Sequence, residues 1–89
     1  MRLQITLNMG AHKGGIVHQI TCDHPAQSLH DFRDFIASHD FIVVKEFYKL
    51  TPPKVGEPGY DPAKRTELVD NGELIVNTSL IGKVRAYLP

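Results

Sequence analysis

The longest apolar run in the chain, residues 40–50, lies near its middle and is rich in β-branched and aromatic side chains. Successive side chains of a β-strand point to opposite faces, so a two-residue period divides the apolar side chains of this run between both faces. One face would carry Phe41, Val43 and Phe47, and the other Ile42, Val44 and Tyr48. A strand that is apolar on both sides is typical of a central strand, and each of its faces then needs a cover.

The residues before this run predict a β-hairpin. Residues 2–8 alternate between apolar and polar side chains, which is typical of a half-buried strand. Residues 16–22 predict a second strand. The glycine-containing segment 9–15 lies between them and predicts a turn, because glycine adopts backbone conformations that other residues avoid.

An amphipathic helix is predicted between the hairpin and the central strand. Segment 23–28 would form its entry, and Ser28 is spaced from Asp31 as in a capping box. Apolar side chains then recur at helical spacing within one arc of the helix surface. They are Leu29, Phe32, Phe35 and Ile36. We expect the helix to lie on the sheet and to end near His39.

The second half of the chain predicts further strands around one long loop. Residues 51–63 contain four prolines and two glycines, so this Pro/Gly-rich segment cannot pair centrally in a sheet and is typical of a functional loop. Residues 66–70 and 73–77 predict two strands, and Asn71-Gly72 between them predicts a type I′ turn. A tight turn over residues 77–82 precedes a last strand at residues 83–88.

The element order β-β-α-β-β-β-β indicates a single α+β domain over residues 1–89. We expect a twisted, mostly antiparallel sheet of five to six strands with one amphipathic helix packed on one face. Phe32, Ile36, Val43 and Phe47 are the expected core. The other face would then expose an apolar patch formed by Ile42, Val44 and Tyr48 with Val69 or Ile75. Two covers for that patch remain open, a second copy of the chain and a sheet that curls on itself like a barrel.

Composition narrows the classes of function. The chain carries ten basic and ten acidic residues, so no net field favours nucleic acid or an anionic membrane. A single cysteine, Cys22, excludes an internal disulfide and favours a reducing compartment. The alternating pattern of residues 1–7 predicts neither a signal peptide nor a membrane span. We therefore expect a cytoplasmic protein without a cofactor.

Cys22, His18 and His24 are the candidates for a metal site or a Cys-based activity. His18 and Cys22 share a strand face but lie about 13 Å apart at the rise of a strand, too far to bind one metal ion without a bend. Cys22 and His24 are nearer and could pair as nucleophile and base. A buried free cysteine and a hydrogen-bonded histidine are the ordinary alternative. The sequence contains no recognisable oxyanion hole, so we expect a protein that is not an enzyme.

Basic residues concentrate in the later strands and allow a nucleic-acid interface as an alternative function. They are Lys45, Lys49, Lys64, Arg65, Lys83 and Arg85. The ordinary explanation of such residues is that lysines on edge strands discourage aggregation. The helix, in contrast, is flanked mainly by aspartates and should form an acidic side.

Residues 72–84, which read Gly-Glu-Leu-Ile-Val-Asn-Thr-Ser-Leu-Ile-Gly-Lys-Val, form a strand, an asparagine, a turn, an isoleucine and a second strand. This pattern resembles the one in LytTR-type DNA-binding domains and in several short bacterial proteins. The resemblance covers no other part of the chain. The same pattern arises in many β meanders, so no functional residue is assigned from it.

The sequence favours a small protein-interaction module that forms a homodimer. We expect the loop at residues 51–63 and an exposed sheet surface to make the contacts, also with a further protein partner. Tyr60, Lys54 and Tyr48 are the expected partner-binding residues, because aromatic side chains tend to dominate interfaces. Nucleic acid is the less favoured partner, and no membrane contact is expected.

Overall fold

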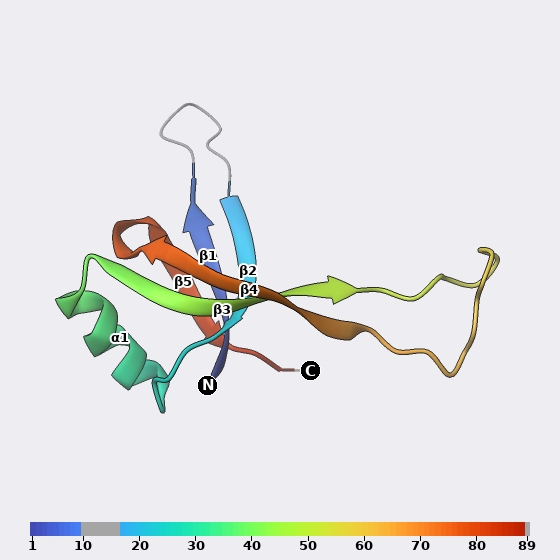
Figure 1. Cartoon of the computed structure of the whole chain (residues 1–89), viewed down its shortest axis with the longest axis horizontal. Helices are drawn as coiled ribbons and strands as arrows, with labels where there is room; N and C mark the ends of the chain where they lie inside the picture. Colours follow the sequence, from blue (N-terminus) through green and yellow to red (C-terminus); the bar gives the residue numbers. More distant parts are fainter. Residues whose placement is uncertain (10–16, 89) are drawn as a thin grey trace.

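A computed structural model describes residues 1–9 and 17–88 and confirms the predicted fold class, a small α+β domain with one helix and a five-stranded antiparallel sheet (Figure 1). The elements are β1 (Arg2–Asn8), β2 (Val17–Asp23), α1 (Leu29–Ser38), β3 (Phe41–Leu50), β4 (Glu67–Asn77), a 3-10 helix η1 (Thr78–Leu80) and β5 (Ile81–Ala86). The strand order across the sheet is β4-β3-β2-β1-β5. The turn predicted at residues 9–15 falls mostly outside the described residues, as does its His12.

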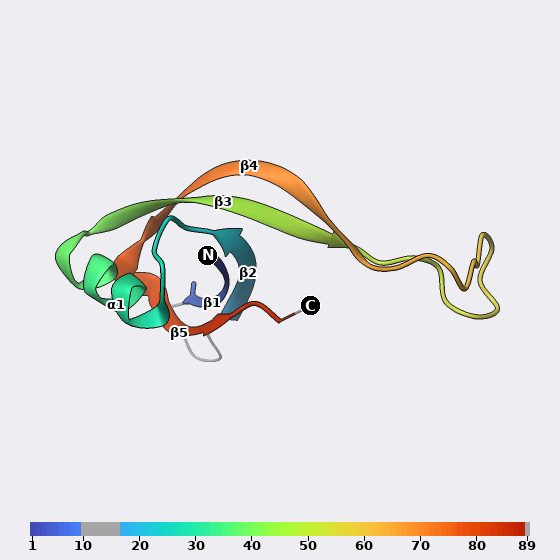
Figure 2. The same cartoon turned by 90° about the horizontal axis from the view of Figure 1, so that it is seen from below.

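The sheet bends strongly between β2 and β3. These two strands pair only over Thr21–Asp23 and Lys45–Phe47, whereas β1 and β2 pair along their whole described length. The ribbon of β3 and β4 therefore crosses over a layer formed by β1, β2 and β5, and α1 lies at the end where β3 begins (Figure 2). The sheet therefore covers part of its own inner face. This arrangement corresponds to the curled, barrel-like sheet that was one of the two predicted covers.

The hydrophobic core lies between the two layers of the bent sheet. Its buried side chains are Leu3, Ile5, Leu7, Ile20, Cys22, Ala26, Phe32, Ile42, Val44 and Val76. The first three come from β1, where strict alternation places every second residue inside. Phe32 is the one residue of α1 that is fully buried, so the helix contributes a single large anchor to the core.

The helix begins and ends where the sequence predicts. Ser28 is the N-cap, and its Oγ accepts a hydrogen bond from the backbone N–H of Asp31 at 3.0 Å. Asp31 Oδ2 in turn accepts from the N–H of Gln27 at 2.9 Å. At the other end, His39 stacks on Phe35 and its Nδ1 lies 2.8 Å from the Phe35 carbonyl oxygen. Since a carbonyl only accepts, Nδ1 carries the proton there, and His39 caps the helix.

The two faces of β3 are the reverse of the prediction. Ile42 and Val44, expected to be exposed, are buried, while Val43 is 52% exposed and Phe47 only half-buried. Ile36 is also half-buried and packs at the border of the core. The alternation itself was correct, but its period does not say which face the helix and the β1–β2 layer will cover. Both lie on the Ile42 and Val44 side.

Asn71-Gly72 does not form the predicted type I′ turn. It lies inside the continuous strand β4, where the two residues stand opposite Glu46 as a β-bulge. Gly72 adopts a φ of +85°, and its N–H donates to Asp70 Oδ1 at 2.8 Å. The Asn71 amide donates to Glu46 Oε1 at 2.7 Å. A bulge and a tight turn both use a glycine with positive φ. Because β4 continues through the bulge, the element order is β-β-α-β-β-β, one strand fewer than expected.

The connection between β3 and β4 is a long arm, residues 51–66, that projects from the rest of the domain (Figure 1). The domain measures 48 × 36 × 20 Å and has a radius of gyration of 15.6 Å, against about 12 Å for a compact chain of this length. We call residues 51–66 the arm and the remainder of the described chain the body. The loop predicted over residues 51–63 contains no strand or helix, and the strand predicted from residue 66 begins at Glu67.

The turn after β4 joins the far end of the sheet to the end of the helix. Asn77 Oδ1 accepts from the N–H of Ser79 at 3.0 Å and so caps η1. Thr78 Oγ1 donates to the carbonyl oxygen of His39 at 2.7 Å, and its N–H donates to that of Asp40 at 2.9 Å. The asparagine, turn and isoleucine pattern thus serves a structural purpose. None of the helices described here has the length and apolarity that crossing a membrane requires.

Candidate functional site

The arm is held in one shape by hydrogen bonds between its own residues. At its tip the N–H of Lys54 donates to Glu57 Oε1 at 2.9 Å, and the N–H of Glu57 donates back to the Lys54 carbonyl at 2.9 Å. The N–H of Tyr60 then donates to the Glu57 carbonyl at 3.2 Å. Gly56 and Gly59 supply the positive φ angles, +88° and +81°, that these turns need. These turns order the backbone at the tip of the arm locally.

The side chains at the arm's tip have little to pack against. Val55 is 80% exposed and Tyr60 45% exposed, although both are apolar or aromatic. Lys54 and Tyr60, two of the three predicted partner-binding residues, lie in the same run of turns. Tyr48, the third, lies on β3 opposite Val69, where it is exposed and lines a cavity of ≈ 450 Å³ together with Thr21. The structure brings together the first two residues and leaves Tyr48 at the root of the arm.

A second exposed apolar surface lies on the outer face of β3 and β4. Phe41, Val43 and Ile75 form it, and Val43 stands directly opposite Ile75 across the two strands. We call these three residues the outer patch. The predicted patch around Ile42 and Val44 is wrong because those side chains face the core. Ile75 is the one residue that the predicted patch and the outer patch share. The two-residue period predicts Phe41 and Val43 as well once it is known which face of β3 is covered.

Cys22 and His24 are part of the core. The Cys22 side chain is completely buried, and this burial, followed by the nearby carboxylates of Asp23 and Glu46, raises the pKa of its thiol to about 12. Since the thiolate is the nucleophile, Cys22 is inert at neutral pH. Its position does not suit a Cys-based activity.

Structural contacts hold the His24 ring in the core. Its Nδ1 accepts a hydrogen bond from the N–H of Ala26 at 3.0 Å, and the ring meets Phe32 and Phe35 edge-on at 4.9 and 4.7 Å between centroids. Burial, and then the charge of the Met1 ammonium, lowers the pKa of His24. His18, in contrast, is exposed on β2 opposite Leu7. Among residues 1–9 and 17–88, no three His, Cys, Asp or Glu side chains converge as metal ligands.

The predicted basic residues are distributed over several surfaces. Lys45 Nζ pairs with Asp70 Oδ2 at 2.9 Å, which raises the pKa of Lys45 and lowers that of Asp70. The Lys49 ammonium lies over the Tyr87 ring, 5.6 Å from its centroid. Arg65 Nη1 donates to the Pro62 carbonyl at 2.8 Å within the arm. Each of these three basic side chains therefore already contacts a neighbouring group of the same chain.

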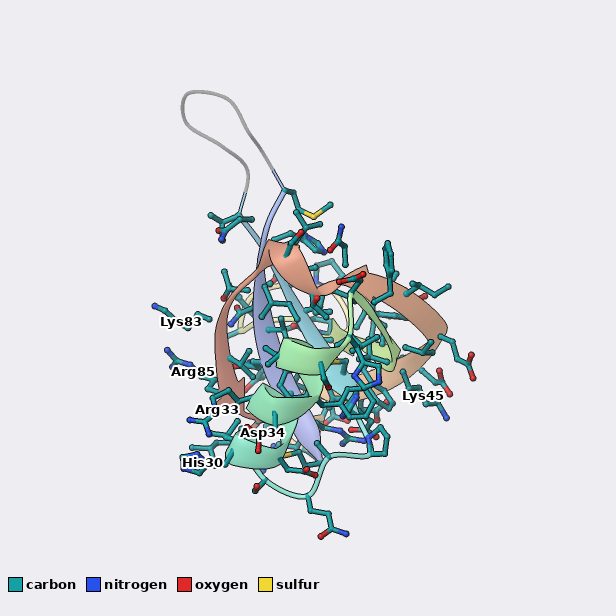
Figure 3. All side chains as sticks on the ribbon, turned by 90° about the vertical axis from the view of Figure 1, so that its left-hand side faces the viewer. His30, Arg33, Asp34, Lys45, Lys83 and Arg85 are labelled. Carbon is teal, nitrogen blue, oxygen red and sulfur yellow. The ribbon has the colours of Figure 1, made fainter. Side chains whose placement is uncertain are left out.

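Lys83 and Arg85 lie apart from the other predicted basic residues. Both are exposed on β5, and α1 packs against this strand. Figure 3 shows them along one edge of the molecule with His30 and Arg33 of the helix, while Lys45 lies toward the opposite side. Arg33 contacts Asp34, with 3.3 Å between Nη2 and Oδ1. Arg33 is thus the basic residue of a helix that the sequence predicts to be flanked mainly by aspartates, and its partner is one of them.

No known protein family, curated protein or solved structure matches this chain. The argument for a function therefore rests on the geometry of the arm, the outer patch and the core.

Proposed function

We propose that this chain is a small, non-enzymatic protein-interaction module that self-associates as a homodimer through the arm and the outer patch. The observation that carries the proposal is the arm, which extends far from the body yet keeps a defined shape through its own turns. An arm whose backbone is already ordered loses little conformational entropy when a partner covers it.

Hydrophobic surface supplies the driving force in this proposal. The tip exposes Val55 and Tyr60, and the outer patch exposes Phe41, Val43 and Ile75. Burial of apolar surface stabilises association by about 25 cal/mol per Å². A domain of this size buries a smaller fraction of its surface than a larger domain does, so covering these side chains would add stability that the monomer lacks. The buried, protonated thiol of Cys22 supports a role without covalent catalysis.

Native mass spectrometry across a range of protein concentrations tests the proposal. We expect a dimer for the wild-type chain, and a shift toward monomer for the arm variant Val55→Ser/Tyr60→Ala and for the patch variant Phe41→Ser. Leu88→Ser is the matched control, because Leu88 is exposed but lies in neither surface. A wild-type chain that stays monomeric at every concentration would contradict self-association. A dimer that tolerates both variants would contradict the surfaces proposed for it.

Nucleic-acid binding is the second candidate function, favoured by the edge at which Lys83 and Arg85 of β5 lie near His30 and Arg33 of α1 (Figure 3). Phosphate contacts by basic side chains make affinity depend steeply on salt. Titration of a labelled duplex DNA and a single-stranded RNA at several salt concentrations tests it. We expect Lys83→Ala/Arg85→Ala to weaken binding and flatten the salt dependence, and Lys45→Ala, whose partner is Asp70, to leave both unchanged.

A further inference from the structure

Strand β4 forms one edge of the sheet, and half of its backbone groups face away from β3. Thr78 N–H donates to the Asp40 carbonyl, which marks that pair as a hydrogen-bonded position of the antiparallel ladder. Such positions alternate along the strands, so the pairs formed by Val76 and Leu74 are hydrogen-bonded as well. The N–H and C=O groups of Glu73 and Ile75 therefore point to the free edge, where they can accept another strand.

An apolar groove runs beside this free edge. It has a volume of ≈ 270 Å³ and lies between β4 and the part of the β1–β2 pair where β1 ends and β2 begins. Leu7 and Ile20 line it from β1 and β2, Leu74 and Val76 from β4, and Leu80 from η1. Four consecutive residues of β4, 74–77, line the groove, so a strand added to the free edge of β4 would direct every second side chain toward it.

Glu46 gives the groove a negative charge. Glu46 lines the groove together with His18, and its carboxylate accepts a hydrogen bond from the neutral Asn71 amide. Glu73, in contrast, stands opposite Lys45 on the outer face of β4, and Lys45 is itself paired with Asp70. Within residues 1–9 and 17–88, neither glutamate forms an ion pair with a lysine or arginine.

We propose that the free edge of β4 binds an extended segment of another protein as an added strand, with apolar side chains at alternating positions and a lysine or arginine beside them. Main-chain hydrogen bonds to Glu73 and Ile75 hold the segment, its apolar side chains fill the groove, and its cation meets Glu46.

Charge distinguishes this partner from a second copy of β4. The strand β4 carries Glu67, Asp70 and Glu73 and no basic residue. Pairing two copies edge to edge would add acidic groups to an acidic groove and supply no cation. The inference stands apart from the proposed dimer, because the groove lies on the inner side of β4 while the outer patch lies on the opposite face.

The test titrates two synthetic peptides into the intact, ¹⁵N-labelled protein and follows its amide resonances by NMR. One is acetyl-Lys-Lys-Val-Thr-Val-Thr-Val-amide, and the other replaces both lysines with glutamates. We expect the basic peptide to shift the amide resonances of Glu73, Ile75, Leu7 and Leu80, and to bind at least about tenfold more tightly than the acidic one, which corresponds to about 1.4 kcal/mol. Glu46→Lys should remove or reverse this preference.

A matched pair of substitutions at one position separates the strand edge from the outer patch. Ile75→Pro removes the free N–H without removing a hydrogen bond to β3, so it should abolish peptide binding while the chain stays folded. Ile75→Thr keeps the N–H and reduces only the outer apolar surface, so it should bind the peptide normally even where self-association weakens. The inference is overturned if the basic peptide shifts no groove resonance at millimolar concentration, if both peptides bind equally, or if Ile75→Pro binds as the wild type does.

Discussion

The body and the arm keep their shapes by different means. In the body, side chains such as Leu3, Ile5 and Phe32 come from distant parts of the sequence and are removed from water together. In the arm, the ordering contacts join residues two or three positions apart, and side chains such as Val55 remain exposed. The body thus depends on long-range burial, and the arm on local hydrogen bonds, prolines and glycines.

In the proposed function, this difference assigns stability to the body and recognition to the arm. A substitution in the body alters the free energy of unfolding of the whole domain, since its contacts form cooperatively. A substitution in the arm changes a segment that contributes little buried surface, so its effect on global stability is small. The arm is therefore free to carry side chains chosen for a partner, and substitutions in the two regions should separate these roles.

The largest effect is expected at Phe32. Phe32→Ala removes the one fully buried side chain of α1 and should lower the free energy of unfolding by about 3 to 5 kcal/mol. Leu29→Ala, on the same helix at an exposed position, should cost less than about 1 kcal/mol. Urea denaturation followed by circular dichroism measures both. Equal losses from the two variants would mean that the helix is anchored differently from the arrangement described.

The two faces of β3 provide the next comparison. Val44 is buried between the layers, whereas Val43 lies on the outer patch. Val44→Ala should destabilise the fold by about 2 kcal/mol, while Val43→Ala should change it by about 0.5 kcal/mol or less. Chemical denaturation of the dilute protein isolates this effect from association. A larger loss of stability from Val43→Ala than from Val44→Ala would mean that Val43 faces the core, as the sequence predicts.

Two glycines with nearly the same backbone conformation compare the body and the arm directly. Gly72 has a φ of +85° at the bulge and Gly56 a φ of +88° in the arm, and a Cβ at either position would meet no atom within 4 Å. The strain of a left-handed residue is about 1 to 2 kcal/mol. Gly72→Ala should show this cost in the melting temperature, because β4 cannot relax without losing its register. Gly56→Ala should show less of it, because the arm can adjust locally.

The pH dependence of stability should report the protonation of His24. Burial lowers its pKa from 6.5, so the folded protein binds protons at His24 less readily than the unfolded chain does. The stability that depends on a neutral His24 is therefore present above pH 6.5 and is lost as the pH falls below it. Melting temperatures measured between pH 7.5 and 5 should fall for the wild type and for His30→Gln. His24→Leu should start lower and show a weaker dependence on pH in this range.

The sequence predicted those features of the fold that local patterns determine. The alternation in β1, the capping by Ser28 and the end of the helix at His39 each depend on neighbouring residues, and all three are confirmed. The Asn71-Gly72 bulge was mistaken for a turn because both use a glycine with positive φ. Only the pairing with Glu46 on another strand decides between them. The orientation of β3 failed for the same reason, since its cover comes from distant elements.

The candidate site was predictable only where it is local. Proline and glycine content marked the arm, and with it Tyr60 and Lys54, as an exposed segment. The outer patch needed the orientation of β3, and the groove beside β4 needed the bend between β2 and β3 that brings β1 and β2 under the edge of β4. These surfaces arise from tertiary structure, for which a single sequence carries no direct signal.

The smallest effect on stability is expected from shortening the arm. Replacing residues 54–64 with a short Asn-Gly turn removes segments that make local contacts and leaves the core side chains in place. Loop-closure entropy changes slowly with length, by about 0.6 kcal/mol for each twofold change, so the shortened chain should be as stable as the wild type or slightly more so. Circular dichroism and thermal melting measure this at low concentration, where association does not contribute. A loss comparable to that of Phe32→Ala would show that the arm belongs to the cooperative unit. Unchanged folding together with lost dimer formation would separate the stabilising body from the recognising arm.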